Sequence, residues 1–160
     1  MGITIDSRET PPEYRERAVS VLGGSIATLQ AGDYLICKCS GVTHSREGHT
    51  LVERKTTDNL VSSLVRKKAN GRLEVFDQLE RCKVDAECVI LLVEGQLRPD
   101  KDSLKSCWTQ KEHKRERKRK VAYCAIQGAL IHIQRDGVIV LWTQTYDETL
   151  VVLDYLNRRR

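Results

Sequence analysis

Two short runs of the chain, residues 89–93 (Val-Ile-Leu-Leu-Val) and residues 138–142 (Val-Ile-Val-Leu-Trp), are apolar at every position. A strand with one solvated face alternates apolar and polar side chains, so an unbroken apolar run predicts a strand with both faces covered. Sequences with helical periodicity lie between and after the two runs. Strands that alternate with helices predict an α/β domain of three layers with a central mixed β-sheet. We expect both runs to be central strands of that sheet.

The N-terminal part of the chain predicts a strand, a helix and a β-hairpin. A β run at residues 3–5 precedes Thr10-Pro11-Pro12-Glu13, which combines a capping box with proline at the first helical position. Gly23-Gly24 supplies a left-handed end to that helix. Further strands are expected over residues 25–30, 34–39 and 51–55. The polar residues 41–48 predict a hairpin loop between the last two.

The remaining segments predict four helices. Thr56 or Thr57 caps the first, the second begins near residue 73, and the third covers residues 121–133 with several small side chains. Thr145-x-x-Glu148 is a capping box that opens the last helix, residues 147–157. That helix is apolar on nearly all sides, so it requires two apolar neighbours. We expect the core to supply one and a second subunit the other, with burial inside a single domain as the alternative.

An acidic and a basic side chain are predicted to share one face of the strand at residues 51–55. Side chains alternate along a strand, so Glu53 and Lys55 project together and Arg54 projects from the opposite face. Asp33 opens a neighbouring strand and brings a second carboxylate. Two carboxylates and an ammonium suit a divalent metal ion and an amine that orients water, which is the chemistry of phosphodiester hydrolysis. A solvated ion pair at a strand edge is the alternative for Glu53 and Lys55.

Gly32-Asp33, followed by Glu53-Arg54-Lys55 and Asp58, forms a motif of the type G-D-x(n)-E-R-K-x-x-x-D. Three more motifs surround it: Ile5-Asp6-Ser7-Arg8-Glu9, Gly71-Arg72 before Phe76-Asp77-Gln78, and Leu92-Val93-Glu94-Gly95. This ordered set resembles the XPF-type structure-specific endonucleases, which include the nuclease domain of the archaeal Hef proteins. The resemblance implies the restriction-endonuclease-like fold. The length of 160 residues predicts one domain, so we expect a single nuclease domain over residues 1–160. Family members commonly add a helix-hairpin-helix domain, and we expect none in this sequence.

The resemblance implies roles for the acidic residues and the lysine. Asp33 and Glu53 match the family's metal ligands, and Lys55 matches the residue that orients or deprotonates the attacking water. Asp6 and Glu9 match accompanying acids that are expected to hold a second metal ion. The implied reaction is Mg²⁺- or Mn²⁺-dependent hydrolysis of DNA to a 5′-phosphate and a 3′-hydroxyl.

The roles expected of four further motif residues are less specific. Arg54 matches the catalytic motif but faces away from Glu53, so we expect structural support or a phosphate contact from it. Asp58 belongs either to the catalytic set or to the helix N-terminus, where a negative charge is stabilised by the helix dipole. Arg72 is expected to contact DNA at the head of its helix. Glu94 lies either near the cleft or at a strand end with no catalytic role.

A strongly basic segment covers residues 111–120, with seven Lys or Arg and two Glu. Its net charge of +5 equals the formal charge of the whole chain. We expect Lys114, Arg115, Lys118 and Arg119 to bind DNA phosphates, because affinity independent of base sequence requires concentrated cations. A solvated surface and a nuclear-import signal are the alternatives.

These observations predict a nuclease that acts on branched DNA, such as flaps, forks or junctions, in repair, recombination or replication. The alternatives are a Holliday-junction resolvase or another nuclease of the same fold, and a non-catalytic DNA-binding subunit of a heterodimer. We expect a homodimer through residues 121–133 and 147–157, with a heterodimer as the alternative.

Composition narrows the compartment in which the chain works. Hydrophobic residues make up 40% of the 160 residues and charged residues 31%, and no apolar run is long enough to span a membrane. The six cysteines contain no C-x-x-C pair, which predicts reduced thiols rather than zinc ligands or disulfides. We expect an intracellular protein, nuclear if the source is a eukaryote or a eukaryotic virus and cytoplasmic otherwise.

Overall fold

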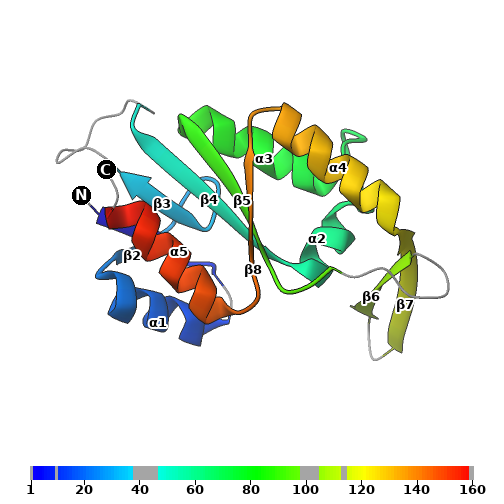
Figure 1. Ribbon diagram of the computed structural model, residues 1–160, viewed down its shortest axis with the longest axis horizontal. Helices are drawn as coiled ribbons and strands as arrows, with labels where there is room; N and C mark the ends of the chain where they lie inside the picture. The colour runs from blue at the N-terminus through cyan, green and yellow to red at the C-terminus, as the bar shows by residue number, and fades with distance from the viewer. Residues whose placement is uncertain (1, 10, 38–46, 98–104, 113–114, 159–160) are drawn as a thin grey trace.

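The computed structural model describes residues 2–9, 11–37, 47–97, 105–112 and 115–158, and of residues 105–120 it describes only the backbone (Figure 1). In chain order the elements are β1 (Gly2–Asp6), α1 (Pro12–Leu22), β2 (Ser25–Ala27), β3 (Tyr34–Cys37), β4 (His49–Thr56), α2 (Thr57–Ser63), α3 (Glu74–Asp85), β5 (Cys88–Glu94), β6 (Lys105–Glu112), β7 (Arg115–Ala122), α4 (Tyr123–Arg135), β8 (Ile139–Thr143) and α5 (Tyr146–Arg158). Six of these strands form the central sheet.

The central sheet is mixed, as the sequence predicts. Its strand order is β2-β1-β3-β4-β5-β8. The β1 strand pairs parallel with β2 and antiparallel with β3, and β3 pairs antiparallel with β4. The β4, β5 and β8 strands run parallel. The predicted hairpin of β3 and β4 is therefore confirmed, while most of its loop, residues 38–46, lies outside the described residues.

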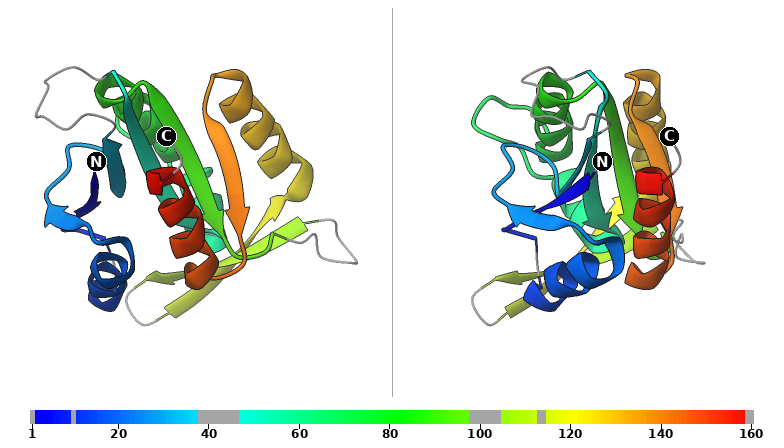
Figure 2. Two further views of the ribbon diagram at one scale, coloured as in Figure 1. Left: turned by 60° about the vertical axis from the view of Figure 1, so that its left-hand side comes forward. Right: turned by 90° about the vertical axis from the view of Figure 1, so that its left-hand side faces the viewer.

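Helices cover both faces of the sheet (Figure 2). Two separate apolar cores lie between these helices and the sheet. One core lies beneath α2, α3 and α4, and the other lies beneath α1 and α5. The β5 strand serves both, because Leu91 and Val93 point into the first core and Ile90 and Leu92 into the second. This double coverage is the reason that β5 is apolar at successive positions, and it confirms the prediction of a central strand.

The prediction of a second central strand at residues 138–142 is wrong, because β8 is the edge strand of the sheet. Ile139 is 47% exposed on one face of β8, and Trp142 is 41% exposed on the other. An apolar run indicates that helices lie near both faces of a strand. It carries no information on whether another strand pairs along the outer side, so the run alone could not distinguish an edge from the centre.

The predicted helix ends are confirmed in part. The Thr56 side chain accepts a hydrogen bond from Asn59 N–H and caps α2, and Thr145 likewise accepts from Glu148 N–H at the start of α5. Gly23 ends α1 with a φ of 64°. The capping box at the start of α1 is wrong, because Pro11 is the N-cap and makes no side-chain cap bond. Thr10 itself lies outside the described residues.

The basic segment forms the end of β6 and the first six residues of β7, which pair as a separate antiparallel hairpin. No secondary structure was predicted for this segment. Figure 2 shows this hairpin below the carboxyl ends of β5 and β8. Arg115, Lys118 and Arg119 are in β7, and their side chains are not described. Lys114 lies outside the described residues. No helix in the described part of the chain is long and apolar enough to cross a membrane.

Candidate active site

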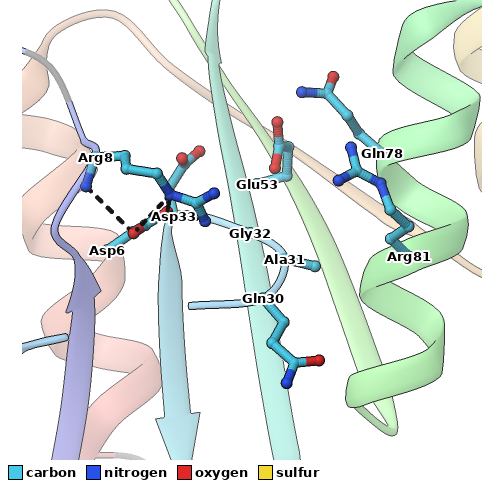
Figure 3. A pocket seen from close by; sticks show the side chains of 9 residues that line it. All are labelled: Asp6, Arg8, Gln30, Ala31, Gly32, Asp33, Glu53, Gln78 and Arg81. Atoms are coloured by element: carbon cyan, nitrogen blue, oxygen red, sulfur yellow. Dashed lines mark hydrogen bonds and ion pairs between the residues drawn. The ribbon is translucent and has the colours of Figure 1, made fainter. Parts of the chain in front are cut away.

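A polar pocket of about 260 Å³ lies at the edge of the sheet where β1 ends and β3 begins (Figure 3). It is lined by Asp6, Arg8, Gln30, Ala31, Gly32, Asp33, Glu53, Gln78 and Arg81. The strand directions explain this convergence. The β3 strand runs antiparallel to both β1 and β4. The carboxyl ends of β1 and β4 therefore lie at the same end of the sheet as the start of β3.

The backbone around Gly32 and Asp33 holds the pocket together. Asp6 N–H donates to the Asp33 carbonyl at 2.8 Å, and Asp33 N–H donates to the Val52 carbonyl at 2.9 Å. Gly32 has a φ of 73°, and a Cβ there would lie 3.1 Å from a Leu51 methyl group. Both the conformation and the close approach therefore favour glycine immediately before Asp33.

Glu53 and Lys55 share one face of β4, as strand alternation predicts. Their side chains form an ion pair at 3.0 Å, and each residue is less than 8% exposed. This burial rules out a solvated ion pair at a strand edge. A charged pair withdrawn from water at the margin of a pocket is costly to maintain, which makes a functional role the better explanation.

Arg54 projects to the opposite face and is fully engaged there. Its guanidinium donates to Glu9 at 2.7 Å and twice to Glu94 at 2.9 Å. It also lies 4.9 Å from the Tyr14 ring centroid and 5.0 Å from that of Tyr146. These two rings stack on each other at 3.9 Å. Of the two roles expected from the sequence, these contacts favour structural support over a phosphate contact.

The Asp6 carboxylate is paired with a neighbouring arginine. The Arg8 guanidinium forms an ion pair with the Asp6 carboxylate at 2.7 Å, and both the Arg8 and Leu29 N–H groups donate to the same carboxylate. Burial alone would raise the pKa of Asp6, but the hydrogen bonds from Arg8 and Leu29 lower it. Figure 3 shows Arg8 extending across Asp6 toward Asp33. Arg8 was not singled out as a site residue by sequence reasoning, although it lies within the Asp6-Ser7-Arg8-Glu9 motif.

Asp33 has the opposite electrostatic environment. Burial of its carboxyl group and the nearby Glu53 and Glu9 carboxylates raise the pKa of Asp33 well above its ordinary value. Burial also raises the pKa of Glu9, although Arg54 opposes that effect. The Asp33 carboxylate accepts a hydrogen bond from Arg54 N–H at 2.7 Å. Three clustered carboxyl groups thus share limited positive charge, and a cation in the pocket would relieve their repulsion.

The donor set fits a single hard divalent cation. Among the described residues, no arginine side chain forms an ion pair with Asp33 or Glu53, and Glu53 is paired with Lys55. Arg8, by contrast, pairs with Asp6, and Arg54 pairs with Glu9. Within the described ranges no three Cys, His, Asp or Glu side chains converge as a complete cage. Mg²⁺ is commonly bound by one or two carboxylates, with waters and substrate phosphates completing the shell. Two available carboxylates in an open polar pocket match that mode of binding.

Two predicted site residues lie away from this pocket. Asp58 is exposed in the first turn of α2 and is not part of the lining, which favours the helix-dipole interpretation. Arg72 is exposed before α3 and lines a different depression with Phe76 and His132. The structure therefore gives neither residue a contact with the acidic cluster.

The α3 helix contributes two pocket residues that sequence reasoning did not assign. Gln78 and Arg81 are three positions apart, so they share one helix face, and Figure 3 shows both projecting toward Glu53. The Phe76-Asp77-Gln78 motif was a signal for Gln78, and helical spacing would then have identified Arg81. Glu94, whose position was left open, lies at the end of β5 and binds Arg54 rather than lining the pocket.

The structure is thus a three-layer α/β domain with a mixed sheet and an acidic pocket at the ends of its central strands. The model of the ERCC4 domain matches residues 5–156, and the chain belongs to this family, which contains the XPF-type endonucleases. Comparison with curated protein sequences gave no match.

The fold is similar to solved structures of an archaeal protein. XPF from Aeropyrum pernix matches with a TM-score of 0.63 and 23% identity, over 100% of this chain and 66% of that one. The same protein in complex with DNA matches with a TM-score of 0.63 and 23% identity, over 98% of this chain and 62% of that one. The chain thus spans about two thirds of the solved chains.

Proposed function

We propose that the chain is a divalent-metal-dependent endonuclease that cleaves branched DNA at flaps, forks or junctions. The observation that carries this proposal is the buried ion pair of Glu53 and Lys55, whose charged atoms are 3.0 Å apart. This pair lies beside Asp33 at the strand ends of an ERCC4 domain. The similar Aeropyrum pernix protein has been solved with DNA, which supports DNA as the substrate here.

Asp33 and Glu53 would hold one Mg²⁺ or Mn²⁺. Such an ion, when bound, polarises the scissile phosphate and lowers the pKa of a bound water. The raised pKa of Asp33 supports this assignment, because burial and the repulsion between the clustered carboxyl groups cause the rise, and a bound cation would compensate their charge. Asp6 and Glu9 are each paired with an arginine, so we propose one ion in place of the two expected from the sequence, with these acids as supports of the site.

The cationic side chains would divide the remaining work. The Lys55 ammonium lies 3.0 Å from the Glu53 carboxylate, so it can orient the attacking water beside Glu53 toward the phosphate. Arg81 is exposed on α3 and lines the pocket beside Glu53, where it can contact a phosphate oxygen. The buried Arg54 would act through Glu9 and Glu94 by fixing the strand ends around the pocket.

Three substitutions test the assignment. Asp33→Asn, Glu53→Gln and Lys55→Ala should each reduce cleavage of an end-labelled fork by at least about a hundredfold, because each removes charge from the reacting centre. Asp58→Asn is the matched control and should cleave at the unmodified rate. Chelator should abolish activity, and added Mg²⁺ or Mn²⁺ should restore it. Unmodified rates in any of the three variants, or full activity in excess chelator, would refute the proposed site.

A substrate panel separates the alternative functions. A flap or fork endonuclease should cut one strand near the branch, whereas a junction resolvase should cut four-way junctions symmetrically. A non-catalytic subunit should bind all of these DNAs and cut none of them, even with Mn²⁺. The acidic pocket favours catalysis, because Asp33 and Glu53 are both present in it.

The β6–β7 hairpin would supply affinity for DNA phosphates. Its second strand contains five Lys or Arg among eight residues, close to the carboxyl ends of the sheet strands (Figure 2). Replacing Lys114, Arg115, Lys118 and Arg119 with Ser should weaken binding to all DNAs, and each lost contact should reduce the log–log salt slope by about 0.9. Replacing Arg135 and Arg158, at the far ends of α4 and α5, should leave the slope unchanged. An unchanged slope in the hairpin variant would show that the hairpin does not contact phosphates.

We also propose that two copies associate through the second half of α4, the start of β8 and α5. Ile131 is 49% exposed, Ile139 47%, Val151 69% and Tyr155 56%, so apolar side chains remain on the surface of all three elements. The predicted need of α5 for a second neighbour agrees with the exposure of Val151 and Tyr155. Val152 is different, because it is partly buried against the core below α5.

A further inference from the structure

A second cavity, of about 400 Å³, lies at the carboxyl ends of β5 and β8, beside the start of α4. It is lined by Gly95, Gln96, Leu97, Tyr123, Gln127, Trp142 and Gln144. Its volume falls in the range of pockets that bind small organic groups. Unlike the acidic pocket, this cavity has no charged residue among the lining residues that belong to the described part of the chain. It is therefore suited to a ligand group that is polar but uncharged.

The lining combines aromatic surface with hydrogen-bonding groups. Trp142 is 41% exposed, although it belongs to a strand of the main sheet, and Tyr123 is partly buried. Three amide side chains, Gln96, Gln127 and Gln144, accompany them. Within the part of the chain that the structure describes, none of these amides takes part in a hydrogen bond. A flat ligand with hydrogen-bonding edges would match both features, since rings stack on its face and amides meet its edge.

Strand register places this cavity next to the active site. Lys55 is paired with Val93 on β5, and Val93 is paired with Trp142 on β8. Residues paired in a parallel sheet share a face, so Trp142 and Lys55 are in one row with Val93 between them. Two strand spacings separate the ends of this row by about 10 Å. A DNA strand cleaved near Lys55 would thus pass within reach of Trp142.

The backbone beside the cavity is also defined. Gly95 directly follows Glu94, has a φ of 104° and donates its N–H to the Thr143 carbonyl at 2.8 Å. A Cβ at Gly95 would lie 3.2 Å from the Thr57 hydroxyl oxygen. The hydrogen bond from Gly95 to Thr143 joins the residue after β5 to the end of β8, and it places Gln96 and Gln144 at the same rim of the cavity.

We propose that this cavity binds one unpaired nucleobase of the DNA strand that enters the active site. The base would stack on Trp142 and Tyr123 while the glutamine amides contact its edge, as occurs in proteins that recognise single strands. The phosphates on either side would be held by the β6–β7 hairpin, because β7 leads directly into Tyr123. This inference rests on the proposed function and adds to it a recognition site for a single-stranded segment beside the branch.

The test is an abasic scan of a fork with single-stranded arms. Binding is measured by fluorescence anisotropy in chelator, so that no strand is cut, with one abasic nucleotide placed at each successive position near the branch. The unmodified protein should lose about tenfold in affinity at one position and little elsewhere. In Trp142→Ala this position dependence should disappear, whereas Trp142→Phe should retain it.

Gln127→Ala provides a second variant that keeps the aromatic rings. It should remove the preference among the four bases at the sensitive position, and Gln134→Ala, an exposed glutamine on the same helix outside the cavity, should not. If the unmodified protein binds and cleaves the fork but its affinity is the same at every abasic position, the nucleobase site is refuted and the proposed function is not. Absence of both binding and cleavage would instead refute the proposed function. A change in the sedimentation of Trp142→Ala would overturn the inference by assigning the cavity to a subunit interface.

Discussion

Replacing Arg54 with Met is expected to destabilise the domain by about 5 kcal/mol at pH 7.5. The side chain is 6% exposed, and its ion-pair partners Glu9 and Glu94 are 6% and 11% exposed. Breaking a buried ion pair by removing one partner costs about 3–5 kcal/mol, because the remaining charge stays uncompensated. The loss of contact with the stacked Tyr14 and Tyr146 rings should add about 1 kcal/mol. Since domains are stable by about 5–15 kcal/mol, the variant would be marginal at 25 °C.

Urea denaturation followed by circular dichroism measures this loss. The triple variant Arg54→Met, Glu9→Gln and Glu94→Gln should recover most of the stability, since no unpaired charge then remains buried. Arg17→Met is the matched control, because Arg17 and its partner Asp147 are 56% and 63% exposed. An exposed ion pair contributes about 1 kcal/mol or less, so this variant should unfold close to the unmodified protein.

The pH dependence identifies the cause of the loss. Burial raises the pKa of Glu9, and Arg54 opposes that rise, so the pKa should increase further when Arg54 is removed. A folded-state pKa above the unfolded value means that stability increases as the pH falls through the folded-state pKa. The deficit of Arg54→Met should therefore shrink between pH 7.5 and pH 5. A deficit below about 1.5 kcal/mol, or one that does not change with pH, would refute the proposed role of the buried charges.

Two further predictions concern the metal site and the assembly. The raised pKa of Asp33 means that the metal-free protein should lose stability as the pH rises above about 4, and Asp33→Asn should show a smaller loss, with only Glu9 still contributing. Thermal melts in chelator from pH 4 to pH 8 test this, and parallel curves for the two proteins would contradict it. Val151→Glu with Tyr155→Glu should yield monomers in sedimentation velocity, because both side chains are exposed on α5. An unmodified protein that sediments as a monomer at micromolar concentration would count against the homodimer.

Local sequence was sufficient for the parts of the site that depend on neighbouring residues. Strand alternation placed Glu53 and Lys55 on one face and Arg54 on the other, and the structure confirms both positions. The apolar run at residues 89–93 correctly indicated a strand covered on two sides. These features follow from the two-residue period of a strand, which acts within a single element and is visible in the chain itself.

Tertiary structure decided which distant residues meet. The pairing of Arg54 with Glu94 depends on β4 and β5 being neighbours, and the pocket position of Arg81 depends on how α3 packs against the sheet. The edge position of β8, which exposes Trp142 in a row with Lys55, depends on strand order. Strand order is set by the combined packing of two cores on either side of the sheet. No local period records that packing, because each contact joins residues that are far apart along the chain.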